Sequence, residues 1–282
     1  MRLLRFIGYF SQLESLIGFK ATCVFTLQHI LNKINPPRDG QLAHVQIGPY
    51  VCHFPSTAFF EGQFTEIFFK ETYYLEPTRE QIQAIDCGAN IGVSLIYIKT
   101  RAPNARVICF EPNPSARKVL EENVEANGWG KDVHIFPFAL GNKKGVVDFF
   151  VENKESTSTS GSVAEHHKNK GSKLNSYTVS VDVLSHYINR NIDFLKIDIE
   201  GAEFDVIEEL ASQNKLAMIS AIQLEYHHIP GFSTHPISQM LSVLEANGFN
   251  TFVESNTLPH NVIGHDTWHT YMLFAWRNSP TR

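Results

Sequence analysis

Cysteine is scarce in this sequence, and the four cysteines that occur do not match the common cysteine-based sites. No two of Cys23, Cys52, Cys87 and Cys109 form a C-x-x-C pair. Because Cys87 and Cys109 lie inside apolar runs, we interpret them as small buried side chains in a reducing compartment. The sequence therefore predicts neither a disulfide framework nor a zinc site.

Long apolar runs and an excess of basic residues are also absent. No stretch reaches the roughly 18 apolar residues that a membrane-spanning helix requires. The apolar amino terminus is interrupted by charged residues and lacks a signal-peptide cleavage pattern. A net charge of −5 over 282 residues disfavours a broad nucleic-acid-binding surface. We therefore expect a cytoplasmic protein without a nucleic-acid partner.

Charge is unevenly distributed along the chain. Residues 1–40 carry five Lys or Arg and two Asp or Glu, a balance of +3, which leaves −8 for the remainder. A solvated helix face is the simpler explanation of such a small basic excess, and contact with a membrane surface or an acidic partner is the alternative.

Two amphipathic helices are predicted at the amino terminus. Apolar residues recur at helical spacing over residues 3–17, and again at Val24, Leu27, Leu31 and Ile34. We expect these apolar stripes to pack on the main domain, because such a stripe is usually a core face. Dimerisation and peripheral membrane contact are the alternatives.

Strand-like runs at residues 44–47 and 50–54 follow these helices and predict a hairpin. We therefore divide the chain into a helical and hairpin extension, residues 1–60, and a main domain, residues 61–282.

From residue 82 onward, strand-like runs alternate with helical ones. This order predicts an α/β fold, with a mostly parallel sheet that helices cover on both faces. Ligands of such sheets bind outside the carboxyl ends of the strands. The expected strands are 82–86, 106–111, 133–138, 193–198, 220–226, 250–254 and 270–276, and the expected helices are 91–101, 114–127, 202–212 and 236–247.

One insertion interrupts the alternation. Residues 146–151 and 177–183 both have the pattern of a strand and predict an inserted β-hairpin. The segment 153–176 between them is rich in Ser, Thr, Lys, Asn and Gly, which is typical of a functional lid or a disordered loop.

The first candidate site is the turn between the strand that ends at Asp86 and the helix that begins near Ile91. Gly88 allows the backbone to approach a ligand closely, and Gly92 allows the helix to pack tightly on the strand. The helix start offers free N–H groups to a carboxylate. A carboxylate at Asp86 would repel a pyrophosphate but suits the ammonium group of a bound amino acid.

Acidic residues also end later strands of the predicted sheet. Glu111 follows the next strand, where a carboxylate can accept hydrogen bonds from both hydroxyls of a ribose. Asp198, Glu200 and Glu203 cluster after a core strand, and such clustering raises carboxylate pKa values and creates candidate bases. The alternative for Glu200 and Glu203 is a preference for the amino end of the next helix.

Glu225 and His227 stand at the end of another predicted strand. Histidine titrates near neutral pH, so His227 is a candidate acceptor for a hydroxyl proton. The neighbouring His228 is more simply explained as a solvated loop residue.

Three segments of the chain resemble the FkbM family of S-adenosylmethionine-dependent methyltransferases. They are I-D-C-G-A-N-I-G at residues 85–92, F-E-P-N at residues 110–113 and L-K-I-D-I-E-G-A-E at residues 195–203. The resemblance covers about residues 65–255. It implies the class I methyltransferase fold, a Rossmann-like seven-stranded sheet whose last strand runs antiparallel.

The resemblance also implies roles for individual residues. The cofactor would be S-adenosylmethionine, and Asp198 would lie nearest to its sulfonium methyl group and to the acceptor hydroxyl. Family members often carry Glu and His at the positions of Glu225 and His227. The implied cofactor-binding residues are Asp86, Gly88, Ala89, Asn90 and Gly92 for the methionine part, Ser94 for its carboxylate, Glu111 for the ribose, and Phe138 and Ala139 for the adenine.

The expected reaction is transfer of a methyl group to a hydroxyl of a sugar, glycolipid or polyketide-like metabolite, the acceptor classes known for the family. Asp198 or His227 would remove the hydroxyl proton. A divalent cation held by Asp198 and Glu225 is the alternative, and we favour the metal-free version.

Two other functions remain open at this point. One is a nicotinamide-dependent oxidoreductase, whose phosphate turn should read G-x-G-x-x-G without a leading acid. Here Asp86 leads the turn and Asn90 replaces the second glycine. The other is a non-catalytic module that binds the cofactor without transferring its methyl group.

Overall fold

The structure is a computed structural model that describes residues 2–36, 38, 41–152, 161–162, 174–228, 235–255 and 269–278. The predicted polar insertion 153–176 lies outside the described residues except at 161–162 and 174–176. Among the described residues, no helix combines the length and the apolar character that a bilayer span requires.

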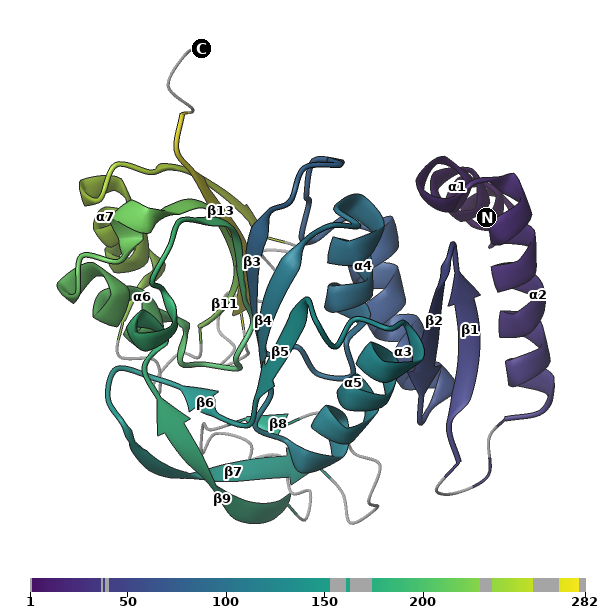
Figure 1. Cartoon of the computed structure of the whole chain (residues 1–282), viewed down its shortest axis with the longest axis horizontal. Coiled ribbons are helices and arrows are strands. Elements are labelled where there is room, and N and C mark those ends of the chain that lie inside the picture. Colours follow the sequence, from purple (N-terminus) through teal and green to yellow (C-terminus); the bar gives the residue numbers. More distant parts are fainter. Residues whose placement is uncertain are drawn as a thin grey trace, which may run out of the picture.

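A seven-stranded sheet forms the centre of the main domain (Figure 1). Its strands are β3 (Gln83–Cys87), β4 (Arg106–Phe110), β5 (Val133–Phe136), β10 (Ile192–Ile197), β11 (Ile219–His228), β12 (Asn250–Ser255) and β13 (His269–Trp276). Their order is β12-β13-β11-β10-β3-β4-β5. The strands from β11 to β5 run parallel, and β13 is antiparallel to both of its neighbours. The predicted class I sheet, with its antiparallel last strand, is confirmed.

Helices cover both faces of this sheet, as the alternating pattern predicts (Figure 1). α4 (Val93–Arg101) and α5 (Pro114–Ala126) lie on one face, and α6 (Glu203–Ser212) and α7 (Ile237–Ala246) lie on the other. The central strands are therefore buried from both sides, which explains why they are apolar runs rather than alternating ones.

The inserted hairpin is confirmed and forms part of a second, four-stranded sheet. Its two long strands are β7 (Gly145–Glu152) and β9 (Leu174–Asp182), which pair antiparallel. Two short strands, β6 (Ala139–Leu140) and β8 (Gly161–Ser162), complete it. Figure 1 shows this sheet beyond one end of the central strands.

The amino-terminal extension contains the two predicted helices and the predicted hairpin, and a helix that we did not predict crosses its expected boundary at residue 60. Phe60, Phe64, Ile67 and Phe68 have the i, i+4, i+7, i+8 spacing of a helix, and all four are buried. The elements are α1 (Arg2–Ile17), α2 (Phe19–Ile34), β1 (Ala43–Ile47), β2 (Tyr50–Phe54), α3 (Thr57–Phe64) and a π-helical turn, η1 (Thr65–Phe69).

The expectation that the apolar stripe of α2 packs on the main domain is wrong. Val24, Leu27, Leu31 and Ile34 are 38%, 59%, 54% and 76% exposed. The opposite face of the helix, which carries Phe25, packs inward against the rest of the extension. Contacts of that opposite face with β1 and α3 therefore decide the orientation of α2, and its apolar stripe remains at the surface.

A buried amide joins the extension to the main domain. The side chain of Asn123 in α5 accepts a hydrogen bond from the N–H of His53 at 2.6 Å. It donates to the carbonyl oxygens of His53 at 3.0 Å and Ile91 at 2.8 Å. Asn123 is fully buried, so water does not replace these bonds.

We predict that Asn123→Ala lowers the free energy of unfolding by about 2–3 kcal/mol, because backbone groups of His53 and Ile91 lose a buried partner. Urea unfolding measures this change. The matched control is Glu125→Ala, an exposed position on the same helix, for which we expect a change within about 0.5 kcal/mol. Equal effects of the two substitutions would contradict the role of Asn123.

Candidate active site

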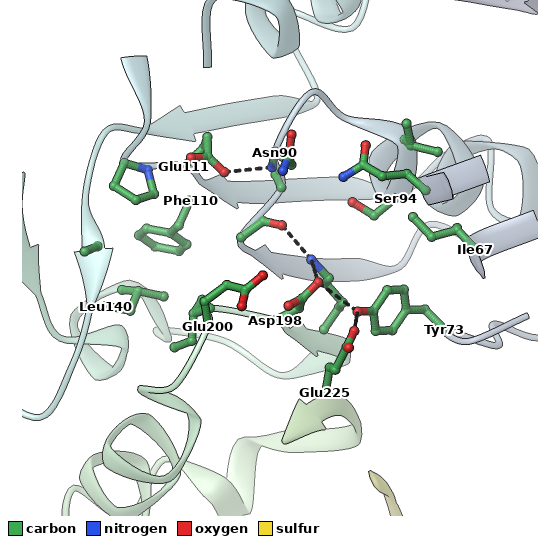
Figure 2. Close-up of a pocket in the computed structure, with 18 of the residues that line it drawn as sticks. Ile67, Tyr73, Asn90, Ser94, Phe110, Glu111, Leu140, Asp198, Glu200 and Glu225 are labelled. Atoms are coloured by element: carbon green, nitrogen blue, oxygen red, sulfur yellow. Dashed lines mark hydrogen bonds and ion pairs between the residues drawn. The ribbon is translucent and has the colours of Figure 1, made fainter. Parts of the chain in front are cut away.

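A cavity of about 220 Å³ opens where the parallel strands end. Residues that follow β3, β4 and β10 converge on it, as expected for a sheet of this kind (Figure 2). The predicted site residues that line it are Gly88, Ala89, Asn90, Ser94, Glu111, Phe138, Ala139, Asp198 and Glu225. The other three predicted site residues, Asp86, Gly92 and His227, are not among its lining residues.

The turn after β3 requires glycine at two positions. Gly88 has a φ of 77°, and a Cβ atom there would lie 1.8 Å from the carbonyl oxygen of Asp198. Gly92 has a φ of 93°, and a Cβ atom there would lie 2.8 Å from a side-chain carbon of Leu120 in α5. Gly88 thus lets the turn meet the end of β10, and Gly92 lets the start of α4 approach α5.

Asp86 is fully buried and faces a lysine of the chain itself. Its carboxylate lies 3.1 Å from Nζ of Lys196 and accepts a hydrogen bond from the hydroxyl of Ser94 at 2.6 Å. Lys196 also donates to the carbonyl oxygen of Gly88 at 2.6 Å. The sequence predicted the ammonium group of a bound amino acid opposite Asp86, and in the structure an internal ammonium group takes this place.

Glu111 lies at the end of β4 with its carboxylate turned toward the turn (Figure 2). One oxygen accepts a hydrogen bond from the N–H of Asn90 and the other from the N–H of Asn113, both at 2.8 Å. Burial raises the pKa of Glu111 to about 7, against the opposite effect of these two bonds. A carboxylate has about four acceptor positions, so two remain for a ligand.

A tyrosine connects two acids on the opposite side of the cavity (Figure 2). The phenol of Tyr73 lies 3.0 Å from Oδ2 of Asp198 and 3.3 Å from Oε2 of Glu225, and it donates to these oxygens. Burial and the negative charge of Asp198 raise the pKa of Glu225 to about 8. A proton on Glu225 near neutral pH limits the repulsion between the two carboxyl groups.

His227 lies behind these acids and is almost completely buried. Nδ1 lies 2.9 Å from Oε1 of Glu203, and Nε2 lies 3.6 Å from carboxylate oxygens of both Glu200 and Glu225. Glu203 and the other acids raise the pKa of His227 well above its usual value, although burial acts in the opposite direction. The surrounding acids therefore favour the protonated form of His227, which makes it a weaker candidate than Asp198 for the group that accepts a hydroxyl proton.

Glu200, Asp198 and His227 form the group of described residues whose spacing suits a metal ion, with ligand atoms within 4.8 Å of one another. A histidine binds a metal ion through a neutral imidazole. A metal ion at this place would have to displace the proton that Glu203 and the neighbouring acids favour on His227.

Sequence reasoning missed one of the groups that shape the cavity, Lys196, and gave another, Tyr73, a place at the acceptor pocket only as the less favoured alternative. Lys196 belongs to the L-K-I-D-I-E-G-A-E segment. It stands between apolar residues of a predicted strand, and this pattern does not indicate whether the lysine side chain is buried. Tyr73 belongs to an aromatic segment for which a core role is the simpler expectation. Phe59 of the extension also lines the cavity, together with Gln63 and Ile67 just beyond the expected boundary at residue 60.

The family described as Methyltransferase FkbM domain matches residues 86–251 of the chain. This chain belongs to the FkbM methyltransferase family. The matched segment begins at Asp86, in the turn after β3, and it contains Glu111, Asp198 and His227. Tyr73, η1 and the rest of the extension precede it.

Similar proteins include other methyltransferases. Methyltransferase 1 of Beauveria bassiana is 27% identical over 237 residues, which cover 76% of this chain and 88% of that protein. The 2-O-methyltransferase NoeI of Sinorhizobium fredii is 26% identical over 136 residues, which cover 44% of this chain and 55% of that protein. The crystal structure of an FkbM methyltransferase from Methylobacillus flagellatus has a TM-score of 0.45 at 15% identity, and the match covers 71% of this chain and 45% of that one.

The raised pKa values around the cavity make stability depend on pH. An acid whose pKa is higher in the folded state binds a proton on folding, so stability falls as pH rises toward the folded pKa. This holds for Glu111 and Glu200, each with a pKa of about 7, and for Glu225 at about 8. His227 acts in the same direction, because its stabilising charge is lost as pH rises through its raised pKa.

We therefore predict that the ligand-free protein has a lower free energy of unfolding at about pH 8 than at about pH 6. Glu225→Gln should reduce this difference, because it removes one of the titrating groups. Urea unfolding at both pH values measures the effect, with Glu125→Gln on the surface of α5 as the control. If the difference between the two pH values is the same in Glu225→Gln as in the native protein, Glu225 is not one of the groups that cause it.

Proposed function

We propose that this protein transfers a methyl group from S-adenosylmethionine to a hydroxyl group of a sugar, glycolipid or polyketide-like metabolite. One observation carries the proposal. The backbone turn and Glu111 stand on one side of a single cavity, and Asp198, Tyr73 and Glu225 stand on the other. A cofactor site and a proton-accepting site therefore border the same space.

The residues present fit this cofactor. S-adenosylmethionine, when bound, supplies a methyl group that is already activated by a sulfonium charge. Glu111 has two acceptor positions left, which suit the two hydroxyls of a ribose. The acids at the ends of β10 and β11 outnumber Lys196 and His227, so the cavity favours a cationic ligand over a pyrophosphate.

The other predicted cofactor contacts have distinct tasks. Gly88, Ala89 and Asn90 present their backbone to the methionine part, and Ser94 lies at the start of α4, where free N–H groups suit a carboxylate. Phe138 and Ala139 border the adenine. Asp86 and Gly92 do not line the cavity. Asp86 fixes the position of Lys196, and Gly92 fixes the start of α4.

Asp198 is the group that accepts the proton of the acceptor hydroxyl. Its side chain is partly exposed to the cavity, and Tyr73 fixes one of its oxygens by a hydrogen bond. Fixed orientation matters because the barrier of a displacement depends strongly on alignment of the reacting atoms. Glu225 and the protonated His227 stabilise the charge of this acid cluster, and the proposal needs no divalent cation.

Two arguments support a hydroxyl group as the methyl acceptor. A carboxylate base is needed for a neutral hydroxyl, which is a poor nucleophile while it carries its proton. One relative is named a 2-O-methyltransferase. Membership in a methyltransferase family speaks against the oxidoreductase alternative, and turnover distinguishes an enzyme from a non-catalytic module.

The test is incubation with S-adenosylmethionine carrying a labelled methyl group and a panel of glycans, glycolipids and hydroxylated metabolites, with mass spectrometry of the products. We predict labelled methyl ethers with the native protein. Asp198→Asn should lower the rate roughly hundredfold to ten-thousandfold, the usual worth of a general base, and leave cofactor affinity nearly unchanged.

Asp148→Asn, an exposed position on β7, is the control and should retain the native rate. Unchanged turnover in Asp198→Asn would contradict the role of Asp198. Cofactor binding without methyl transfer to any hydroxyl would favour the non-catalytic alternative.

A further inference from the structure

The surface of α2 is unusual because its solvent-facing side is the apolar one. Besides Phe19 at its first position, which is 62% exposed, five large apolar side chains of this helix are between 38% and 76% exposed. They are Val24, Leu27, Ile30, Leu31 and Ile34, which we call the α2 face. At 3.6 residues per turn these positions fall on one side of the helix, so they form a continuous stripe.

The polar side chains of α2 are used for contacts within the protein. Gln28 accepts a hydrogen bond from the N–H of Gln46 in β1, and His29 is hydrogen bonded to Glu61 in α3 at 2.6 Å. Lys33 forms an ion pair with the same glutamate at 2.5 Å. These contacts fix the rotation of the helix and hold the α2 face outward, at the side of the molecule away from α6 and α7 (Figure 1).

A second cavity, of about 400 Å³, lies between α1, α2, α3 and η1. Its lining is mainly apolar and aromatic, with Phe25, Phe60 and Phe64 in its wall. Ile30 belongs both to this lining and to the α2 face, so the cavity adjoins the stripe. An apolar cavity beside an apolar surface suits a hydrocarbon chain.

The charge of this region distinguishes among the partners that could cover the α2 face. Residues 1–40 carry +3, which becomes +2 when Glu61, the ion-pair partner of Lys33, is counted with them, and the rest of the chain is negative. Lys20 is exposed near the amino end of α2. An anionic bilayer attracts this segment, whereas a second copy would bring an equal positive charge against it.

We propose that α2 docks this protein on an anionic phospholipid bilayer, with the α2 face in the interfacial layer. Helices that lie in this layer present an apolar stripe to the acyl chains and carry basic residues for the headgroups. Burial of five large apolar side chains and attraction to anionic lipid act together. Of the three acceptor classes proposed above, a position at the bilayer favours the glycolipid. This preference rests on the proposed function, whereas the docking surface itself does not.

α3 and η1 connect the docking surface with the active site. Phe60 and Phe64 line the second cavity, whereas Phe59, Gln63 and Ile67 of the same segment line the cavity near Asp198. The second cavity is thus separated from the cofactor cavity by the segment α3–η1 alone.

The test is co-sedimentation of the full chain with vesicles of phosphatidylcholine alone and of phosphatidylcholine mixed with phosphatidylglycerol. We expect binding to the anionic vesicles that weakens as salt is added. The triple substitution Leu27→Gln, Leu31→Gln and Ile34→Gln should lower the bound fraction at least tenfold. The control Val146→Gln with Phe252→Gln removes exposed apolar residues elsewhere and should bind as the native protein does.

Circular dichroism checks that the triple variant keeps its helices, and calorimetry with S-adenosylmethionine checks its cofactor site. Retained cofactor binding with lost vesicle binding supports the docking surface whether or not the methyl acceptor is identified. Absence of vesicle binding by the native protein, or equal binding by the triple variant, overturns the proposal. A native dimer that dissociates in the triple variant assigns the α2 face to self-association and overturns it as well.

Discussion

The buried ammonium group of Lys196 is the contact on which the active-site geometry depends. It lies between the carboxylate of Asp86 and the carbonyl oxygen of Gly88, and Asp198 follows two residues later on the same strand end. A buried charge costs several kcal/mol unless a partner compensates it, so this ion pair constrains β3 and β10 to one arrangement. The cofactor turn and the proposed base are thereby held in fixed relation.

The electrostatics of the cavity follow from the same arrangement. Parallel strands bring their carboxyl ends together, and here these ends carry Asp198, Glu200 and Glu225 beside only two internal cations, Lys196 and His227. Burial and the negative charge of neighbouring acids raise the pKa values of Glu200 and Glu225, so the protein compensates in part by retaining protons there. A cationic methyl donor compensates further, so cofactor choice and the pH dependence of stability have a common physical origin.

Much of this site could be predicted from the sequence because parallel topology alone places the residues after strands at one edge. Glu111 and Asp198 are found in this way, and the antiparallel last strand follows from the family resemblance, whereas Asp86 is buried against Lys196 and does not line the cavity. For Tyr73 the sequence leaves two alternatives, a core role and a place at the acceptor pocket, because aromatic residues serve both, and the structure shows it buried beside Asp198. The exposure of the apolar face of α2 could not be predicted. An amphipathic pattern shows that a helix has an apolar face, but it does not show what covers that face.

The central claim is that Glu111 holds the ribose of S-adenosylmethionine, and titration calorimetry tests it most directly. At about pH 8 Glu111 is largely ionised, because its pKa is about 7. The account predicts that the native protein binds S-adenosylmethionine and not NAD, and that Glu111→Gln weakens binding roughly tenfold, the difference between a charged and a neutral acceptor. Tight binding of NAD, or unchanged affinity in Glu111→Gln, would contradict it.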